Sequence, residues 1–136
     1  AKAAAETIRG RLAEFIADPV ECGVVLATLA EEMPVQETIE LIALLRQRMG
    51  RPPELVVANA LYPVYPAGAA ARAGRGEGGL DRILGLWRDR RAVNDRELDR
   101  LRQEWRGTLL ELPLLPLTRG PALLDAVVQA LEEELA

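Results

Sequence analysis

The segment Leu26–Pro66, LATLAEEMPVQETIELIALLRQRMGRPPELVVANALYPVYP, decides the fold. It contains most of one short apolar run, Gly23–Leu29, and all of a second, Leu55–Leu61. Both runs are typical of buried strands. Between them, Pro34–Met49 has the composition and spacing of a helix. A helix that joins two buried strands makes a βαβ unit, in which the strands are parallel. We therefore expect a parallel sheet with helices on both faces.

The rest of the chain extends this α/β pattern. Helical spacing predicts helices over Ala1–Ile16 and Ala122–Leu135, and a short apolar run, Leu109–Leu112, predicts a third strand. Residues 80–107 are expected to form a helical hairpin, because Asn94–Glu97 (NDRE) has the form of a capping box that begins a second helix. The predicted architecture is a single domain over residues 1–136, a three-layer fragment of a parallel sheet with a helical hairpin insertion.

Two features indicate that the chain is a piece of a larger protein. Three strands make a narrow sheet with two unpaired edges, and long unpaired edges favour aggregation. The sequence also begins with Ala1 in what already reads as a helix. We expect Ala67–Gly79 to be a mobile, glycine-rich loop, and its GRGEGG stretch does not have the spacing of a phosphate-binding loop.

The composition excludes several classes of function. Of the 136 residues, 49% are apolar and 28% are charged, which is typical of one globular domain. The net charge of −4 gives no general attraction to nucleic acid, so no nucleic-acid partner is expected. With one cysteine and no histidine, the chain has neither a Ser–His–Asp triad nor a cysteine-pair metal site. No run is long enough to span a membrane, and we expect a cytoplasmic protein.

Three segments together resemble one family. They are Leu26–Leu41 (LATLAEEMPVQETIEL), Leu55–Pro63 (LVVANALYP) and Leu112–Val127 (LPLLPLTRGPALLDAV). In order and spacing they are similar to the C-terminal half of the ArsA/Get3-type ATPases, the anion-transporting and tail-anchored-protein-targeting group of deviant-Walker P-loop proteins. The resemblance implies a P-loop NTPase type of sheet, with ATP and Mg²⁺ as cofactors. It also implies ATP hydrolysis coupled to anion efflux or membrane-protein targeting.

The resemblance implies four site residues. Asn59 matches the asparagine that hydrogen-bonds the adenine of ATP, and an amide offers both a donor and an acceptor to a base edge. Glu37 matches the glutamate of a Glu-Thr pair near the nucleotide, and Pro113 and Leu115 match the walls of the adenine pocket. From the residues alone, Asn59 is equally an ordinary turn cap or backbone partner. Glu37 is equally a first-turn carboxylate favoured by the helix dipole.

The catalytic parts of the family are missing from this chain. It has no glycine-rich phosphate loop with two lysines, no magnesium-binding Ser or Thr of such a loop, and no matching water-orienting aspartate. Because phosphoryl transfer depends on positioning the phosphates and the metal, this chain alone should not hydrolyse ATP, and no catalytic or metal-binding residue is predicted. The implied partners are the N-terminal half of the same ATPase or a paired subunit in a homo- or heterodimer, with a membrane-protein client or membrane pump. The alternative is a non-enzymatic partner or a regulatory α/β binding module.

Overall fold

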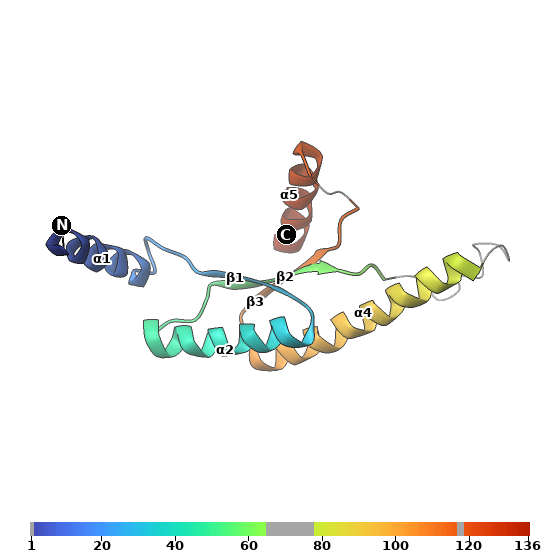
Figure 1. Ribbon diagram of the computed structural model, residues 1–136, viewed down its shortest axis with the longest axis horizontal. Helices are drawn as coiled ribbons and strands as arrows, with labels where there is room; N and C mark the ends of the chain where they lie inside the picture. Colours follow the sequence, from blue (N-terminus) through green and yellow to red (C-terminus); the bar gives the residue numbers. More distant parts are fainter. Residues whose placement is uncertain (1, 65–77, 117–118) are drawn as a thin grey trace.

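The computed structural model shows an α/β protein built on a three-stranded parallel sheet (Figure 1). It describes residues 2–64, 78–116 and 119–136. In chain order the elements are α1 (Lys2–Ala17), β1 (Val25–Leu29), α2 (Glu32–Met49), β2 (Leu55–Leu61), α4 (Gly78–Glu104), β3 (Thr108–Pro113) and α5 (Pro121–Leu135). The loop predicted at Ala67–Gly79 lies outside the described residues, except for the two glycines that begin α4.

The sheet confirms the predicted βαβ unit. Its order is β1-β2-β3, and β2 is parallel to both neighbours. Val25 pairs with Leu55 in the first ladder, and Leu55 pairs with Thr108 in the second. The bounds of β2 agree with the sequence prediction, whereas β1 begins two residues later than predicted and β3 is longer by one residue at each end.

The ends of α2 follow from its sequence. Arg46 and Arg48 lie in the last turn, where cations interact favourably with the helix dipole. Gly50 follows with φ 69°, and its N–H donates to the Arg46 carbonyl at 3.1 Å. This left-handed cap suits glycine because it has no Cβ. The predicted basic last turn and the predicted cap are both confirmed.

Helices cover the sheet on two sides, which gives three layers. In Figure 1, α2 and α4 lie on one face and α5 on the other. The main core lies between the sheet and the α2–α4 layer, in two clusters of buried side chains: Val35, Ile42, Val56, Leu101 and Trp105, and Ala30, Ala58, Leu61 and Leu98. Val56 and Ala58 of β2 point into this core, so Val57 points toward the α5 side of the sheet.

The predicted helical hairpin is wrong, because α4 is one continuous helix of 27 residues. Asn94 and Glu97, the two ends of the apparent capping box, make other bonds instead. Asn94 is buried in the middle of α4, and its side-chain amide bonds to the backbone of the strand ends. The buried Glu97 carboxylate pairs with Arg96 at 3.0 Å and with Arg100 at 3.4 Å. A local start signal is therefore overridden by packing.

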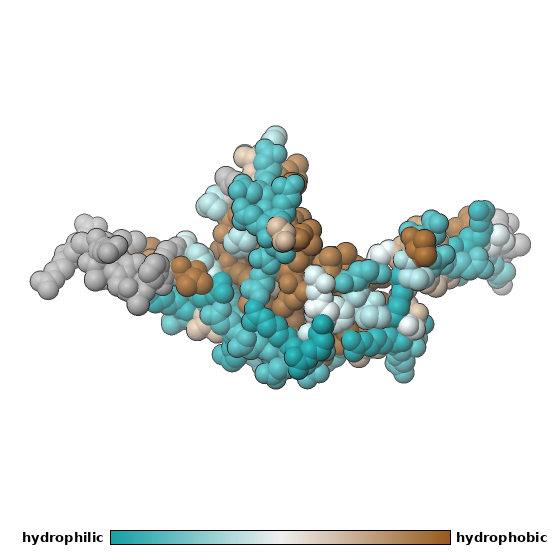
Figure 2. All heavy atoms as spheres, turned by 180° about the vertical axis from the view of Figure 1, so that it is seen from behind, coloured by the Kyte–Doolittle hydropathy of each residue, from teal (hydrophilic) through white to brown (hydrophobic). Residues whose placement is uncertain are grey.

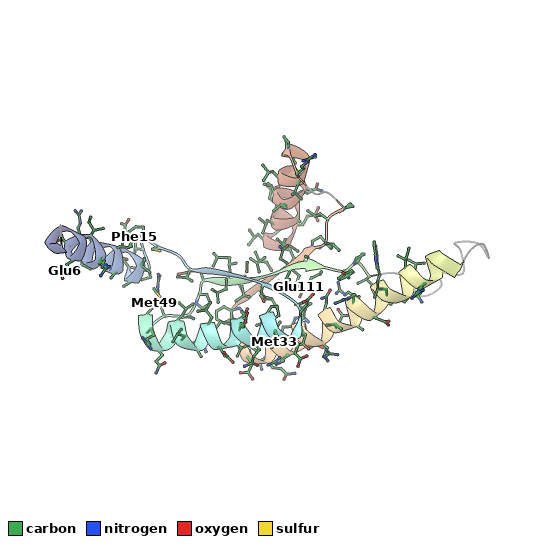
Figure 3. The ribbon with its side chains drawn as sticks, viewed as in Figure 1. Glu6, Phe15, Met33, Met49 and Glu111 are labelled. Atoms are coloured by element: carbon green, nitrogen blue, oxygen red, sulfur yellow. The ribbon has the colours of Figure 1, made fainter. Side chains whose placement is uncertain are left out.

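The sheet has an apolar surface beside α5 that no described element covers. Val25 and Leu29 of β1 are 57% and 42% exposed, and Leu124 and Val128 of α5 are also exposed. Figure 2 shows this apolar surface on both sides of α5. Helix α1 extends away from the sheet, with Phe15 half exposed near its end (Figure 3). Parallel sheets are normally covered on both faces, so the β1 side is incomplete within the described residues.

Candidate functional site

A pocket of about 250 Å³ lies where β2 and β3 end. It is lined by residues of the β2 end, the segment after β3, and the first turns of α5: Asn59, Ala60, Pro113, Leu114, Leu115, Leu123 and Val127. The carboxyl ends of parallel strands are the usual position of ligand sites in such sheets. Three of the four predicted site residues, Asn59, Pro113 and Leu115, therefore line one pocket.

A β-bulge shapes this pocket. Ala58 pairs with Glu111 and Leu61 pairs with Pro113, so β2 has one residue more than β3 in this interval. As a result Ala58 and Leu61 both point into the α2–α4 core, although strict alternation would send Leu61 to the other face. The extra residue leaves Ala60 in the left-handed region, with φ 58°, which costs about 1 kcal/mol or more for a residue with a Cβ.

The bulge also fixes the Asn59 side chain. The Ala60 N–H donates to Asn59 Oδ1 at 2.9 Å, and the amide nitrogen of Asn59 makes no hydrogen bond with the part of the chain that the structure describes. Beyond the bulge, the Leu114 N–H donates to the Leu61 carbonyl at 2.8 Å, which restores strand pairing. Among the described residues, the N–H₂ group of Asn59 therefore has no partner, and Asn59 lines the pocket.

The chemistry of the lining suits a flat, largely apolar group. Pro113, Leu115 and Val127 supply apolar contacts, and Asn59 supplies the one polar side chain among the described lining residues. A heteroaromatic ring with an acceptor nitrogen at its edge fits this combination, because its faces are apolar and its edge accepts a hydrogen bond. The lining residues that the structure describes contain no cation, so these residues provide no charged partner for phosphates.

Glu37 lies at a different place. It is exposed on α2 and lines a second pocket of about 340 Å³, together with residues of β1 and α2: Leu26, Ala27, Thr28, Leu29, Pro34, Thr38 and Leu41. This pocket is at the unpaired edge of β1, on the α2 side of the sheet, whereas Asn59 shares its pocket with α5 residues. The structure thus does not bring Glu37 to the Asn59 pocket.

A cluster of α4 side chains at the end of β2 was not predicted from the sequence. Trp87, Arg91 and Asn94 of α4 all contact Tyr62, the residue that follows β2. Their i, i+4, i+7 spacing puts them on one face of a continuous helix. That spacing was a usable signal, but the hairpin prediction separated Asn94 from the other two residues.

Comparisons with known proteins do not assign the chain to a family. No protein-family model matches the sequence, and a search of curated proteins finds no significant match. Within the described ranges, no three Cys, Asp or Glu side chains are grouped so that they could hold a metal ion. None of the described helices combines the length and apolar content that crossing a lipid bilayer requires.

Proposed function

We propose that this chain is the C-terminal, adenine-side part of an ATPase that resembles the ArsA/Get3 type. The Asn59 pocket receives the adenine ring of ATP. The observation that carries this proposal is the position of Asn59, Pro113 and Leu115 around one pocket at the carboxyl ends of parallel strands. These three residues come from segments about fifty positions apart, and the resemblance had assigned all three to adenine.

Within this pocket each residue has a physical role. The Asn59 amide nitrogen donates to a ring nitrogen of adenine, while its oxygen stays on the Ala60 N–H. Pro113 and Leu115 pack against the ring, which favours a planar base over a flexible ligand. The strained Ala60 is consistent with a functional bulge, because positive-φ residues other than glycine are retained where a site needs the geometry.

The phosphates and Mg²⁺ would be bound by another part of the protein, either an N-terminal half or a paired subunit. The unpaired edge of β1 is the position we assign to that part. The crossovers through α2 and α4 step from β1 to β3 and share one face, as right-handed connections require. By the same rule, a crossover helix on the α5 face would connect strands in the opposite direction across the sheet, from the β3 side toward the β1 side. The exposed side chains of Val25 and Leu29 supply the apolar face that such a crossover would cover.

Glu37 fits this arrangement as a residue of the junction. It lines the pocket at the β1 edge, where the phosphate-binding part would pair. The proposed protein acts in the cytoplasm as a dimer and couples ATP hydrolysis to anion efflux or to membrane-protein targeting. A catalytic role stays outside this chain, because it contains no phosphate loop.

A second candidate is a non-enzymatic partner or regulatory binding module. It is favoured by the neutral lining of the Asn59 pocket, which suits a base but offers nothing to phosphates. The two candidates differ in one assay. The full-length protein that carries this sequence should bind and hydrolyse ATP under the first proposal, and should bind an adenine compound without hydrolysis under the second.

The test is calorimetric ATP binding to the full-length protein, before and after Asn59→Ala. Loss of one base hydrogen bond should weaken binding about tenfold, which corresponds to about 1.4 kcal/mol. ADP and adenosine should lose affinity by the same factor, because the amide contacts only the base. Gln47→Ala removes an exposed amide at the far end of α2 and serves as the matched control. Equal ATP affinity for Asn59→Ala and wild type would refute the assignment.

A further inference from the structure

The end of β2 is held by a three-residue contact from α4. The Trp87 and Tyr62 rings meet edge to face, with centroids 6.3 Å apart and planes at 70°. Arg91 Nη1 donates to the Tyr62 carbonyl at 2.9 Å, and the Tyr62 N–H donates to Asn94 Oδ1 at 2.9 Å. Both backbone polar groups of Tyr62 and its side chain are therefore engaged by one face of one helix.

Asn94 also reaches the neighbouring strand. Its Nδ2 donates to the carbonyl of Ala30, directly after β1, at 2.9 Å. A single amide thus joins the carboxyl ends of β1 and β2, and its side chain is 5% exposed. Asparagine is a weak helix former, and a buried amide is costly unless it is fully bonded. Its presence in the interior of α4 therefore needs a tertiary reason, and these two bonds supply it.

Tyr62, the residue that α4 contacts, lies next to the bulge. Tyr62 follows Leu61, and Leu61 follows Asn59–Ala60, so the α4 contact fixes the backbone two residues from the left-handed Ala60. A non-glycine residue persists in that region only when its surroundings over-determine the backbone. On the β3 side, the bulge is held by the bond from the Leu114 N–H to the Leu61 carbonyl. On the α4 side, the corresponding restraint is Tyr62.

We propose that Asn94 and Arg91 are positioning residues, which hold Tyr62 and thereby set the Asn59–Ala60 bulge in its ligand-binding geometry. They act on the pocket through the backbone and line no part of it. This inference rests on the proposed function only for the identity of the ligand. The backbone restraint itself is measurable without any nucleotide.

The experiment is amide hydrogen exchange on the full-length protein without ligand, followed by ATP binding well below the unfolding temperature. Arg91→Gln removes the bond to the Tyr62 carbonyl and, with it, the ion pair between Arg91 Nε and Asp95, which Asp95→Asn removes alone as a control. Asn94→Leu removes both amide bonds at similar volume. Arg91→Gln should accelerate exchange across Ala60–Tyr62 by about fivefold, the factor for one hydrogen bond, and Asn94→Leu, which removes two, should accelerate it by more. Both variants should raise the dissociation constant for ATP severalfold. Arg90→Gln makes the same charge change at an exposed neighbour and should alter neither quantity.

Two results would overturn the inference. One is unchanged exchange at Ala60–Tyr62 in both variants. The other is faster exchange with an unchanged ATP affinity, because Tyr62 would then have only a structural role. If Asn94→Leu does not fold, Arg91→Gln alone decides between these outcomes. Absence of ATP binding in the wild type would instead refute the proposed function, and the exchange measurement would still report whether α4 restrains the bulge.

Discussion

Gly107 is the position where one added methyl group should damage the core most. A Cβ built there would overlap Cζ2 of Trp105 and lie 2.6 Å from its Cη2, far inside ordinary contact distance. The indole cannot rotate away freely, since Trp105 is 5% exposed and packs with Val56 and Leu101. Its Nε1 donates to the Thr108 carbonyl at 3.0 Å, and Arg46 lies 5.9 Å from the ring centroid.

The cost of Gly107→Ala follows from these contacts. Forcing extra volume into a packed core costs about 2 kcal/mol, and the lost indole hydrogen bond adds about 1 kcal/mol. We expect a loss of about 3 kcal/mol, measured by urea unfolding followed by far-ultraviolet circular dichroism. Gly85→Ala is the control: it lies in α4 with no heavy atom near its Cβ, and it should gain about 0.5 to 1 kcal/mol.

A double-mutant cycle with Trp105→Leu tests the cause. In that background the ring is gone, so Gly107→Ala should cost less than about 0.5 kcal/mol. The reasoning is refuted if Gly107→Ala stays within about 0.5 kcal/mol of wild type. It is equally refuted if the same large loss occurs with leucine at position 105, because a backbone effect would then be responsible.

Two further predictions concern the strand ends. Ala60→Gly relieves the strain of the left-handed backbone and should leave the free energy of unfolding unchanged or raise it by about 0.5 kcal/mol. The control is Ala27→Gly in an ordinary exposed strand position, which should lower it by about 0.5 to 1 kcal/mol. Equal losses for the two variants in urea unfolding would argue against strain at Ala60. The second concerns Glu54, whose pKa is lowered from its ordinary value of 4.5, mainly by the hydrogen bond from the Val24 N–H, against partial desolvation, with help from Arg51. A carboxyl group whose pKa is lower in the folded state stabilises the fold above pH 4.5, and this contribution is lost as the pH falls. The difference in urea midpoint between wild type and Glu54→Gln should therefore shrink from pH 7 to pH 3. A constant difference would contradict this linkage.

Sequence periodicity identified the elements well and the tertiary polar contacts poorly. The βαβ unit was predictable because Leu55–Leu61 is a strand-length run that is apolar except for Asn59, and because Gly50 ends α2 with a glycine cap. Both signals are local. The continuity of α4 was not predictable in the same way, because Asn94 and Glu97 form a valid local start signal. What decides against it is a pair of bonds to Ala30 and Tyr62, which are 64 and 32 residues away in sequence.

The Asn59 pocket was likewise predictable only in part from the sequence. That Asn59 stands near a strand end could be inferred from its place in an apolar run. The bulge that turns it toward Pro113 could not, because no glycine marks Ala60 as a left-handed position. Glu37 was grouped with Asn59 through the resemblance, and the α2 helix puts it at the β1 edge instead. Glu37 and Asn59 therefore line two different pockets of the sheet.

The length of α4 has a mechanical consequence. From Asn94 back to its first residue, Gly78, the helix measures about 24 Å at about 1.5 Å per residue, and this part extends beyond the strand ends in Figure 1. Ile83 and Leu86 on it are more than half exposed. A tilt of about 10° about Asn94 would therefore move the tip by about 4 Å, while the strand ends near the fulcrum hardly move. A small tilt of α4 at the strand ends would thus become a larger displacement at its N-terminal end.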